Sequence, residues 1–135
     1  MANDVIPFYE PATAITAQVG SAVTGKRFVA VSADRQAGPA LNSSSTGGNI
    51  VIAPCGAGVK AMGVAARDAL TGDKVKVYVQ NVVVPVTCGA VALTAGVEVQ
   101  SDATGQAIVL AGGRACGRVI ANCAIGADAQ IMLYP

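Results

Sequence analysis

Short runs of β-branched and other apolar residues recur along this chain, and glycine, asparagine or aspartate interrupts them roughly every ten residues. Several runs alternate apolar and polar side chains, which is the period of a strand with one buried face. β-Branched residues fit the pleated surface of a sheet, whereas the interruptions are typical of turns. The runs read AITAQV, RFVAVSA, IVIAP, VKVYVQNVVVPV, VEVQS, AIVLA and AQIMLYP. Their spacing predicts an all-β fold, a small β-barrel or β-sandwich-like domain.

Residues 59–70, VKAMGVAARDAL, allow two interpretations. The alanines could support a short helix, whereas Gly63 and the β-rich surroundings favour a strand and a turn. The predicted fold therefore contains at most one short helix. Residues 37–49, AGPALNSSSTGGN, form a polar, glycine-rich stretch that predicts a loop.

The first twelve residues, MANDVIPFYEPA, predict an extended N-terminal arm. Pro7 and Pro11 disfavour a helix, and between them Phe8 and Tyr9 supply two of the five aromatic residues of the chain. We expect so apolar an arm to lie on a partner, or else to form an edge strand on its own domain. The domain organisation is then an arm over residues 1–12 and a single β domain over residues 13–135.

A near match to a phosphate-binding loop lies in residues 20–27. GSAVTGK fits the first seven positions of the pattern G-x-x-x-x-G-K-[ST], but Arg27 stands where a hydroxyl should hold Mg²⁺. A working loop of this kind is followed by a helix, whose N-terminal amides face the phosphates. The residues after it, Phe28 to Val31, alternate like a strand, so a hairpin turn at Thr24, Gly25 and Lys26 is the better prediction.

The apolar residues, 53% of the 135, are mainly small, and only 4% are aromatic. A core of alanine and valine removes little area from water, so we expect further burial between subunits. The mean hydropathy of +0.53 agrees with this expectation. No apolar run approaches the ~18 residues of a spanning helix, and the start lacks a basic leader, so neither a membrane nor secretion is expected.

Charge and cysteine usage exclude several partners. The formal charge is only +1, and no basic cluster exceeds the pair Lys26–Arg27, so nucleic acid is not an expected partner. The cysteines form no C-x-x-C pair, and the chain has no histidine, so we expect buried thiols in a reducing cytosol rather than a metal site or a cofactor. The four cysteines are Cys55, Cys88, Cys116 and Cys123.

Catalytic constellations are missing from the sequence. Without histidine, a serine or cysteine nucleophile would need another base, and no G-x-S-x-G motif is present. The carboxylates lie mainly beside glycine turns, as solvated turn residues do, and do not indicate an acid–base pair. We therefore expect that the protein is not an enzyme.

A weak internal echo links residues 63–77, GVAARDALTGDKVKV, to residues 117–131, GRVIANCAIGADAQI. Both segments have two glycines nine positions apart, followed by an alternating run. Two related strand–turn–strand units would suit a barrel, although glycine-rich β sequences also produce such matches by chance.

Three stretches carry a resemblance to a known family: PFYEPATAITAQ with VTGKRFVAVSADRQ, GVAARDALTGDKVKV, and the ending GADAQIMLYP. With them the chain resembles the capsid decoration, or cement, proteins of tailed bacteriophages, particularly those of actinobacterial phages. The resemblance covers both ends and the middle of the chain. It rests on strand and turn residues rather than on catalytic signatures.

The resemblance implies a structural virion protein, made in the host cytoplasm and placed on the capsid exterior. Such proteins bind the major capsid protein as homotrimers and stabilise the icosahedral shell. A small β domain gains stability from a closed symmetric assembly, and three linked copies reinforce each other's binding. The alternatives are a phage tail- or fibre-associated module and a ligand-binding β-barrel, whose mouth would normally display more aromatic residues.

The predicted interface residues lie in two places. In the arm, Pro7, Phe8, Tyr9 and Pro11 would provide rigid contact area on a neighbouring subunit. In the domain, Lys26, Arg27 and Arg35 could pair with acidic groups of the capsid, or they are ordinary solvated charges.

Overall fold

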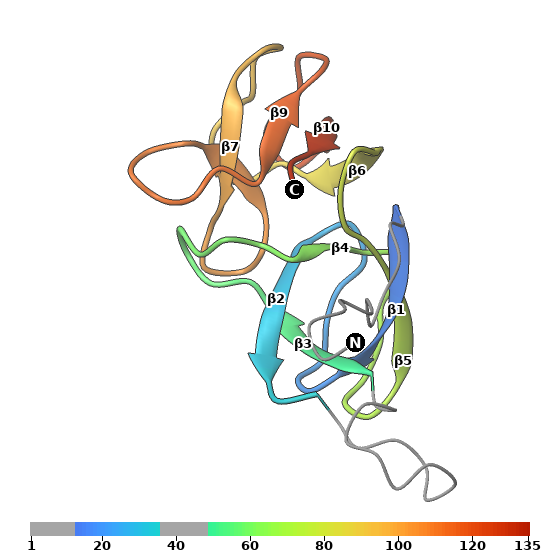
Figure 1. Cartoon of the computed structure of the whole chain (residues 1–135). Helices are drawn as coiled ribbons and strands as arrows, with labels where there is room; N and C mark the ends of the chain where they lie inside the picture. The colour runs from blue at the N-terminus through green and yellow to red at the C-terminus, as the bar shows by residue number, and fades with distance from the viewer. Residues whose placement is uncertain (1–12, 36–48) are drawn as a thin grey trace, which may run out of the picture.

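The computed structural model describes residues 13–35 and 49–135, and in these ranges it contains ten strands and no helix. The strands form two groups, one above the other in Figure 1. The first group holds β1 (Ala14–Val19), β2 (Phe28–Ala33), β3 (Ile50–Pro54), β4 (Gly63–Ala65) and β5 (Lys74–Tyr78). The second holds β6 (Val83–Thr87), β7 (Glu98–Ser101), β8 (Ala107–Val109), β9 (Gly117–Val119) and β10 (Asp128–Leu133).

These strands confirm the all-β prediction and, within it, the β-barrel. Residues 59–70 contribute β4 and a turn, so the strand-and-turn interpretation of this segment was right. The predicted arm, residues 1–12, lies outside the described residues, as does most of the predicted loop.

The first group closes into a barrel in the order β1-β3-β2-β4-β5, because β1 pairs with β5. β1 runs parallel to β3, and the other neighbours are antiparallel. Alternation decides which side chains enter the barrel: in β5, Val75 and Val77 are buried while Lys74 and Lys76 are exposed. The barrel core is therefore built mainly from small aliphatic side chains: Ala17, Val19, Val23, Val29, Ile52, Ala65, Ala69, Val75 and Val77.

One part of the turn prediction was wrong. The chain does turn at Gly25 and Lys26, but β1 and β2 do not form a hairpin, since the neighbours of β1 are β3 and β5. Before the turn, Val23 makes a bridge to Ala69, in the middle of the β4–β5 connection. Before it enters β2, the chain thus contacts the β4–β5 connection at Val23 and Gly25.

The second group repeats the pairing of the first. In the first group the pairs are β1–β5, β5–β4, β4–β2 and β2–β3, and in the second they are β6–β10, β10–β9, β9–β7 and β7–β8. The registers agree as well, because Ala14 lies opposite Tyr78 as Val83 lies opposite Met132. We call residues 13–79 the first half and residues 82–133 the second half.

The turns of the two halves also correspond. The bridge between Val23 and Ala69 has its counterpart in the bridge between Leu93 and Cys123. In each half, a side chain from the second of the two bridged segments accepts a hydrogen bond from the backbone of the first. The amide of Gly25 donates to Asp68 at 2.8 Å, and the amide of Ala95 donates to Asn122 at 2.8 Å. The following residue has a positive φ in both halves, 61° at Lys26 and 90° at Gly96. The sequence echo is therefore part of a structural repeat that spans both halves.

The two halves differ in closure. β6 and β8 meet only at the bridge between Cys88 and Ala107, so the second sheet has a gap where the first is closed. Residues 26–28 of the first half lie at this gap. The carbonyl of Lys26 accepts a hydrogen bond from the amide of Thr87 at 2.8 Å, and the amide of Phe28 donates to the carbonyl of Gly105 at 2.7 Å.

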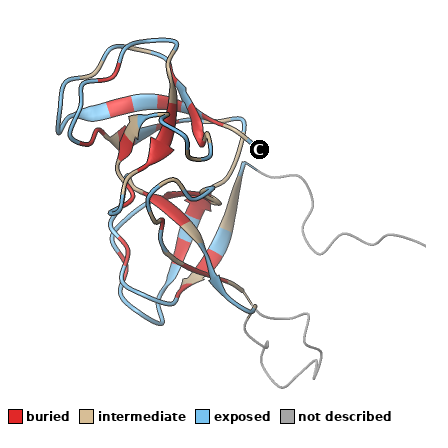
Figure 2. Ribbon diagram, turned by 90° about the vertical axis from the view of Figure 1, so that its left-hand side faces the viewer, coloured by how far each residue is buried: buried red, intermediate tan, exposed pale blue. Residues whose placement is uncertain are grey.

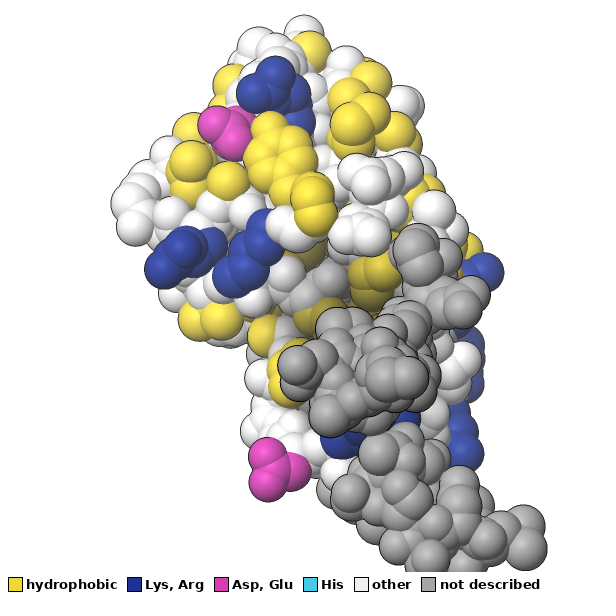
Figure 3. All heavy atoms as spheres, in the orientation of Figure 1, with side chains coloured by type: hydrophobic (Ala, Val, Ile, Leu, Met, Phe, Trp, Pro, Cys, Tyr) yellow, Lys and Arg dark blue, Asp and Glu magenta, His cyan; other side chains and the backbone are white. Residues whose placement is uncertain are grey.

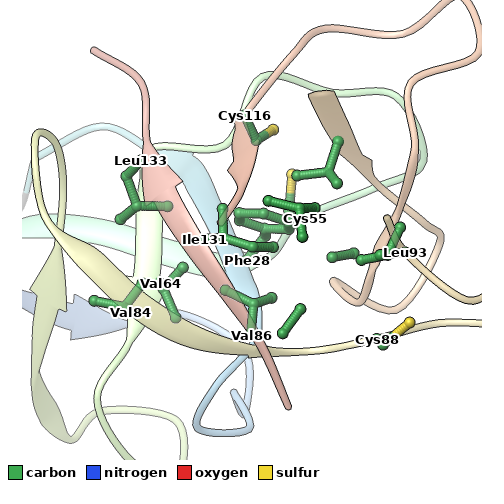
Figure 4. Packing of buried hydrophobic residues seen from close by; sticks show 14 residues of the cluster. Phe28, Cys55, Val64, Val84, Val86, Cys88, Leu93, Cys116, Ile131 and Leu133 are labelled. Carbon is green, nitrogen blue, oxygen red and sulfur yellow. The ribbon is translucent and has the colours of Figure 1, made fainter. Parts of the chain in front are cut away.

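The side chain of Phe28 enters the core of the second half at this point. It is fully buried and belongs to one hydrophobic cluster with Val86, Val99 and Ile131. Cys55 and Val64 of the first half belong to the same cluster, as Figure 4 shows. Buried residues accordingly continue from one group of strands into the other in Figure 2.

Candidate interaction surface

Residues 20–27, which nearly match a phosphate-binding loop, lead into a strand. β2 begins at Phe28, directly after the turn, so residues 20–27 do not precede a helix N-terminus. The strand prediction for this segment is confirmed. Phe28 and Ala30 face the shared cluster, and Val29 faces the barrel core.

The predicted interface residues are not gathered in one place. Pro7, Phe8, Tyr9 and Pro11 lie outside the described residues. Lys26 and Arg27 lie together at the junction of the two halves, whereas Arg35 is half-buried just beyond the end of β2. Their predicted role toward a capsid stays a prediction.

Lys26 has a partner in the second half. Its ammonium lies 2.6 Å from a carboxylate oxygen of Asp128, the first residue of β10. Both side chains are substantially exposed, so the pair adds at most about 1 kcal/mol to the contact between the halves. The sequence offered no signal for this pair, because 102 positions separate the two residues.

Arg27 lines a pocket of about 250 Å³ between the halves. One terminal nitrogen of its guanidinium donates a long hydrogen bond, 3.5 Å, to the carbonyl oxygen of Thr104 in the β7–β8 turn. The Nε atom is buried and has no hydrogen-bond partner among the described residues. The remaining lining is largely apolar.

A second hollow, of about 440 Å³, lies between β4, β5 and β6. Its lining is mainly apolar, from Val64, Tyr78 and the segment 82–85, and also includes Lys26. The ammonium of Lys76 lies 4.9 Å from the centre of the Tyr78 ring, close enough for a cation–π contact. Sequence reasoning did not single out this hollow, because its residues have the alternation of ordinary strand residues.

Large apolar side chains are also exposed at scattered points of the surface. The most exposed are Leu70 at 71%, Ile125 at 62% and Val31 at 60%. Figure 3 shows hydrophobic side chains interspersed with Lys and Arg on one face of the second half. The other exposed large apolar residues are Val59, Val83, Val91, Val109, Ile120 and Met132. Single apolar residues are normal on a protein surface, but this number suits a chain that buries more area in an assembly.

Charge is segregated between the halves, although the whole chain is nearly neutral. The first half carries seven basic and three acidic residues, a formal charge of +4. Residues 80–135 carry two basic and three acidic residues, a formal charge of −1, and the first twelve residues add −2. The basic half therefore provides the surface best suited to an acidic partner.

The four thiols are free, and three of them are buried, as the sequence predicted. Burial raises the pKa of the Cys55 thiol, and burial together with the neighbouring Cys123 raises the pKa of the Cys88 thiol. The buried Cys116 accepts a hydrogen bond at its sulfur from the amide of Ala61 at 3.4 Å. These thiols behave as small apolar side chains that contact the backbone.

We expect thiol labelling of the folded protein near neutral pH to modify Cys123 first. Cys123 is half-buried, whereas a raised pKa leaves Cys55 and Cys88 with little reactive thiolate, and their burial hinders the reagent. Mass spectrometry of peptides after brief treatment with iodoacetamide measures the order. In denaturant all four should react alike. Labelling of Cys55 or Cys88 as fast as Cys123 in the folded protein would contradict the described burial.

The described residues contain no group of three or more metal-ligating side chains. Among their elements there is also no helix that is long and apolar enough to span a membrane.

Comparison with known proteins gives a likeness of fold. No model of a protein family and no curated protein matches the sequence. Among solved structures, the chain is similar to the N base of the head fiber protein gp8.5 of bacteriophage phi29, with a TM-score of 0.65 and 19% sequence identity. The alignment covers 89% of this chain and 92% of that one. The shared fold thus includes both halves rather than a single barrel.

Proposed function

We propose that this chain is a structural protein of a bacteriophage virion, which binds the major capsid protein on the capsid exterior as a homotrimer and stabilises the shell. The observation that carries the proposal is the likeness of fold over nearly the full length of a phage head fiber base. The resemblance of the sequence to capsid decoration proteins points to the same class of protein independently.

The surface supports an assembled state. Small aliphatic side chains fill the barrel, and large ones such as Leu70 and Ile125 are exposed. Burial of these side chains against like copies would add stability that the isolated chain lacks. Three copies would then present three capsid-binding surfaces together, which strengthens weak individual contacts.

For the capsid contact we propose the arm residues Phe8 and Tyr9, flanked by Pro7 and Pro11, together with the basic first half. Aromatic side chains give large contact area at a low cost in conformational entropy. Among the cations of that half, Lys26, Arg27 and Arg35 are the proposed capsid contacts.

A second candidate function follows from the neighbour itself, which is described as the base of a head fiber. In that role the chain would occupy the same place on the shell and would also hold a further fibre segment. This candidate corresponds to the fibre-associated alternative from the sequence, and it differs from simple decoration in needing a second protein partner.

We expect the purified protein to have about three times the 13.3 kDa mass of the chain and to co-sediment with expanded shells of its phage. Light scattering after size-exclusion chromatography measures the mass, and sedimentation with shells measures occupancy. A truncation that lacks residues 2–11 should remain folded and lose shell binding. A monomer that ignores the shells would refute the proposal, and a truncation with full occupancy would refute the role of the arm.

A further inference from the structure

The pocket at Arg27 combines one cation with apolar walls. Residues of the first half form one side, and the β7–β8 turn of the second half forms the other. The lining includes Val23, Thr24, Phe28 and Pro54 from the first half and Ala103 and Thr104 from the second. Arg27 is half-buried, so the apolar walls shield its charge from water in part and strengthen an ion pair formed there accordingly.

The guanidinium of Arg27 makes fewer hydrogen bonds than its N–H groups could donate. An arginine offers five N–H donors, and the one hydrogen bond of Arg27 within the described residues is the long contact of 3.5 Å to Thr104. Nε is buried without a partner in the same part of the chain. A buried donor without an acceptor carries a cost in free energy, so Arg27 has hydrogen-bonding capacity that the described residues do not use.

Nearby carboxylates of the described residues are engaged elsewhere. Asp128 pairs with Lys26 at 2.6 Å. One oxygen of Asp102 accepts hydrogen bonds from the amide and hydroxyl of Thr104 and from the amide of Gln106, at 2.8, 3.0 and 2.9 Å. Asp68 accepts from the amide of Gly25. Within the described residues, no carboxylate therefore forms an ion pair with Arg27.

We propose that this pocket binds the carboxylate of an aspartate or glutamate side chain that a partner protein presents. The proposal rests on the proposed function, in which that partner is the capsid protein, and it names the chemistry of one contact. A guanidinium edge matches a carboxylate with two parallel hydrogen bonds. The apolar walls suit the methylene groups that precede such a carboxylate.

Two features favour a carboxylate over a phosphate. The pocket contains a single cation, whereas a phosphate carries more charge and usually collects several donors. The second cation nearby, Lys26, lines the other hollow and already has an acidic partner. The volume of about 250 Å³ accommodates the end of a side chain rather than a large ligand.

The direct test is an NMR titration of the full chain, observed at the Nε–H resonance of Arg27. Sodium propionate is the probe, with sodium chloride of equal ionic strength as control and inorganic phosphate as competitor. We expect a saturable shift with propionate, none with chloride and a weaker response to phosphate. No saturable shift with propionate, or an equal response to phosphate, would overturn the assignment.

The second test measures shell occupancy of three variants. Arg27→Met removes the charge and keeps the length, and it should weaken binding about tenfold or more. Arg27→Lys keeps the charge but cannot donate two parallel hydrogen bonds to one carboxylate. It should therefore recover only part of the lost shell binding. Arg114→Met, at an exposed arginine of the second half, is the matched control and should bind like the wild type.

The outcomes separate this inference from the proposed function. If the wild type binds shells and Arg27→Met binds equally well, the pocket assignment fails while the function stands. If the wild type does not bind shells, the function fails, and the propionate titration still decides whether the pocket takes a carboxylate. If Arg27→Met does not fold, Arg27→Lys and the titration decide.

Discussion

Replacement of Gly63 by alanine is expected to lower the free energy of unfolding by about 3 kcal/mol or more, or to prevent folding. Gly63 is the first residue of β4 and lies against β5. A Cβ atom there would collide with the carbonyl oxygen of Tyr78 and would lie 2.8 Å from a methyl carbon of Val77. Because the obstacle is backbone in a closed barrel, it cannot move aside as a flexible side chain could.

Urea denaturation followed by circular dichroism measures this effect. Gly117, the counterpart of Gly63 at the start of β9, should respond in the same direction, since its Cβ would lie 2.5 Å from the carbonyl oxygen of Met132. Gly56→Ala is the matched control. Its Cβ would meet only a side-chain carbon of Val59 at 3.5 Å, so its stability should change by no more than about 1 kcal/mol. A Gly63→Ala protein as stable as this control would show that the close approach of β4 to β5 is wrong.

Phe28→Ala is expected to lower the free energy of unfolding by about 3–5 kcal/mol, the largest loss from any single side-chain truncation among the described residues. Phe28 is fully buried and is the one aromatic residue among the buried described residues of the cluster that the two halves share. Its removal leaves a cavity at the gap between β6 and β8, where the second half depends on the first for cover. The loss should therefore affect both halves.

Chemical denaturation with separate probes tests both the size and the reach of this effect. Val31→Ala, three residues along the same strand at a side chain that is 60% exposed, is the control and should change stability by about 0.5 kcal/mol or less. In the wild type we expect one transition, in keeping with a single domain over residues 13–135. Two separate wild-type transitions would show that the halves fold independently, and a Phe28→Ala loss below about 1 kcal/mol would contradict the described burial of Phe28.

The strands could be predicted from sequence because alternation and turn residues are local signals. The observed strands β2 and β10 lie at the predicted runs RFVAVSA and AQIMLYP. The order of strands in the barrel could not be predicted in this way. A turn at Gly25 and Lys26 suggested a hairpin, but pairing of β1 with β3 and β5 depends on contacts between distant segments.

The internal repeat was nearly invisible in the sequence for a physical reason. Phe28 and Glu98 occupy equivalent positions, as do Val64 and Arg118, since each pair of strands has the same register. In the first half this face is covered by the second half, whereas in the second half Arg118 is exposed. Equal backbones in unequal surroundings require different side chains, and sequence similarity is lost at those positions.

The candidate site was predictable only in part. The basic character of Lys26 and Arg27 is visible in the sequence, and it led to a prediction of contacts with acidic groups. That Lys26 would find Asp128 while Arg27 would line a pocket depends on how the second half sits on the first. Local sequence carries no information on that placement.

The gap that residues 26–28 fill has a consequence for biosynthesis. A ribosome releases the first half before the second, and the first half closes its barrel with its own strands. The strands of the second half emerge later, when the segment that supplies Phe28 and two backbone hydrogen bonds to them has already been synthesised. The order of the two halves along the chain thus makes the residues that cover the gap available before the strands that they cover.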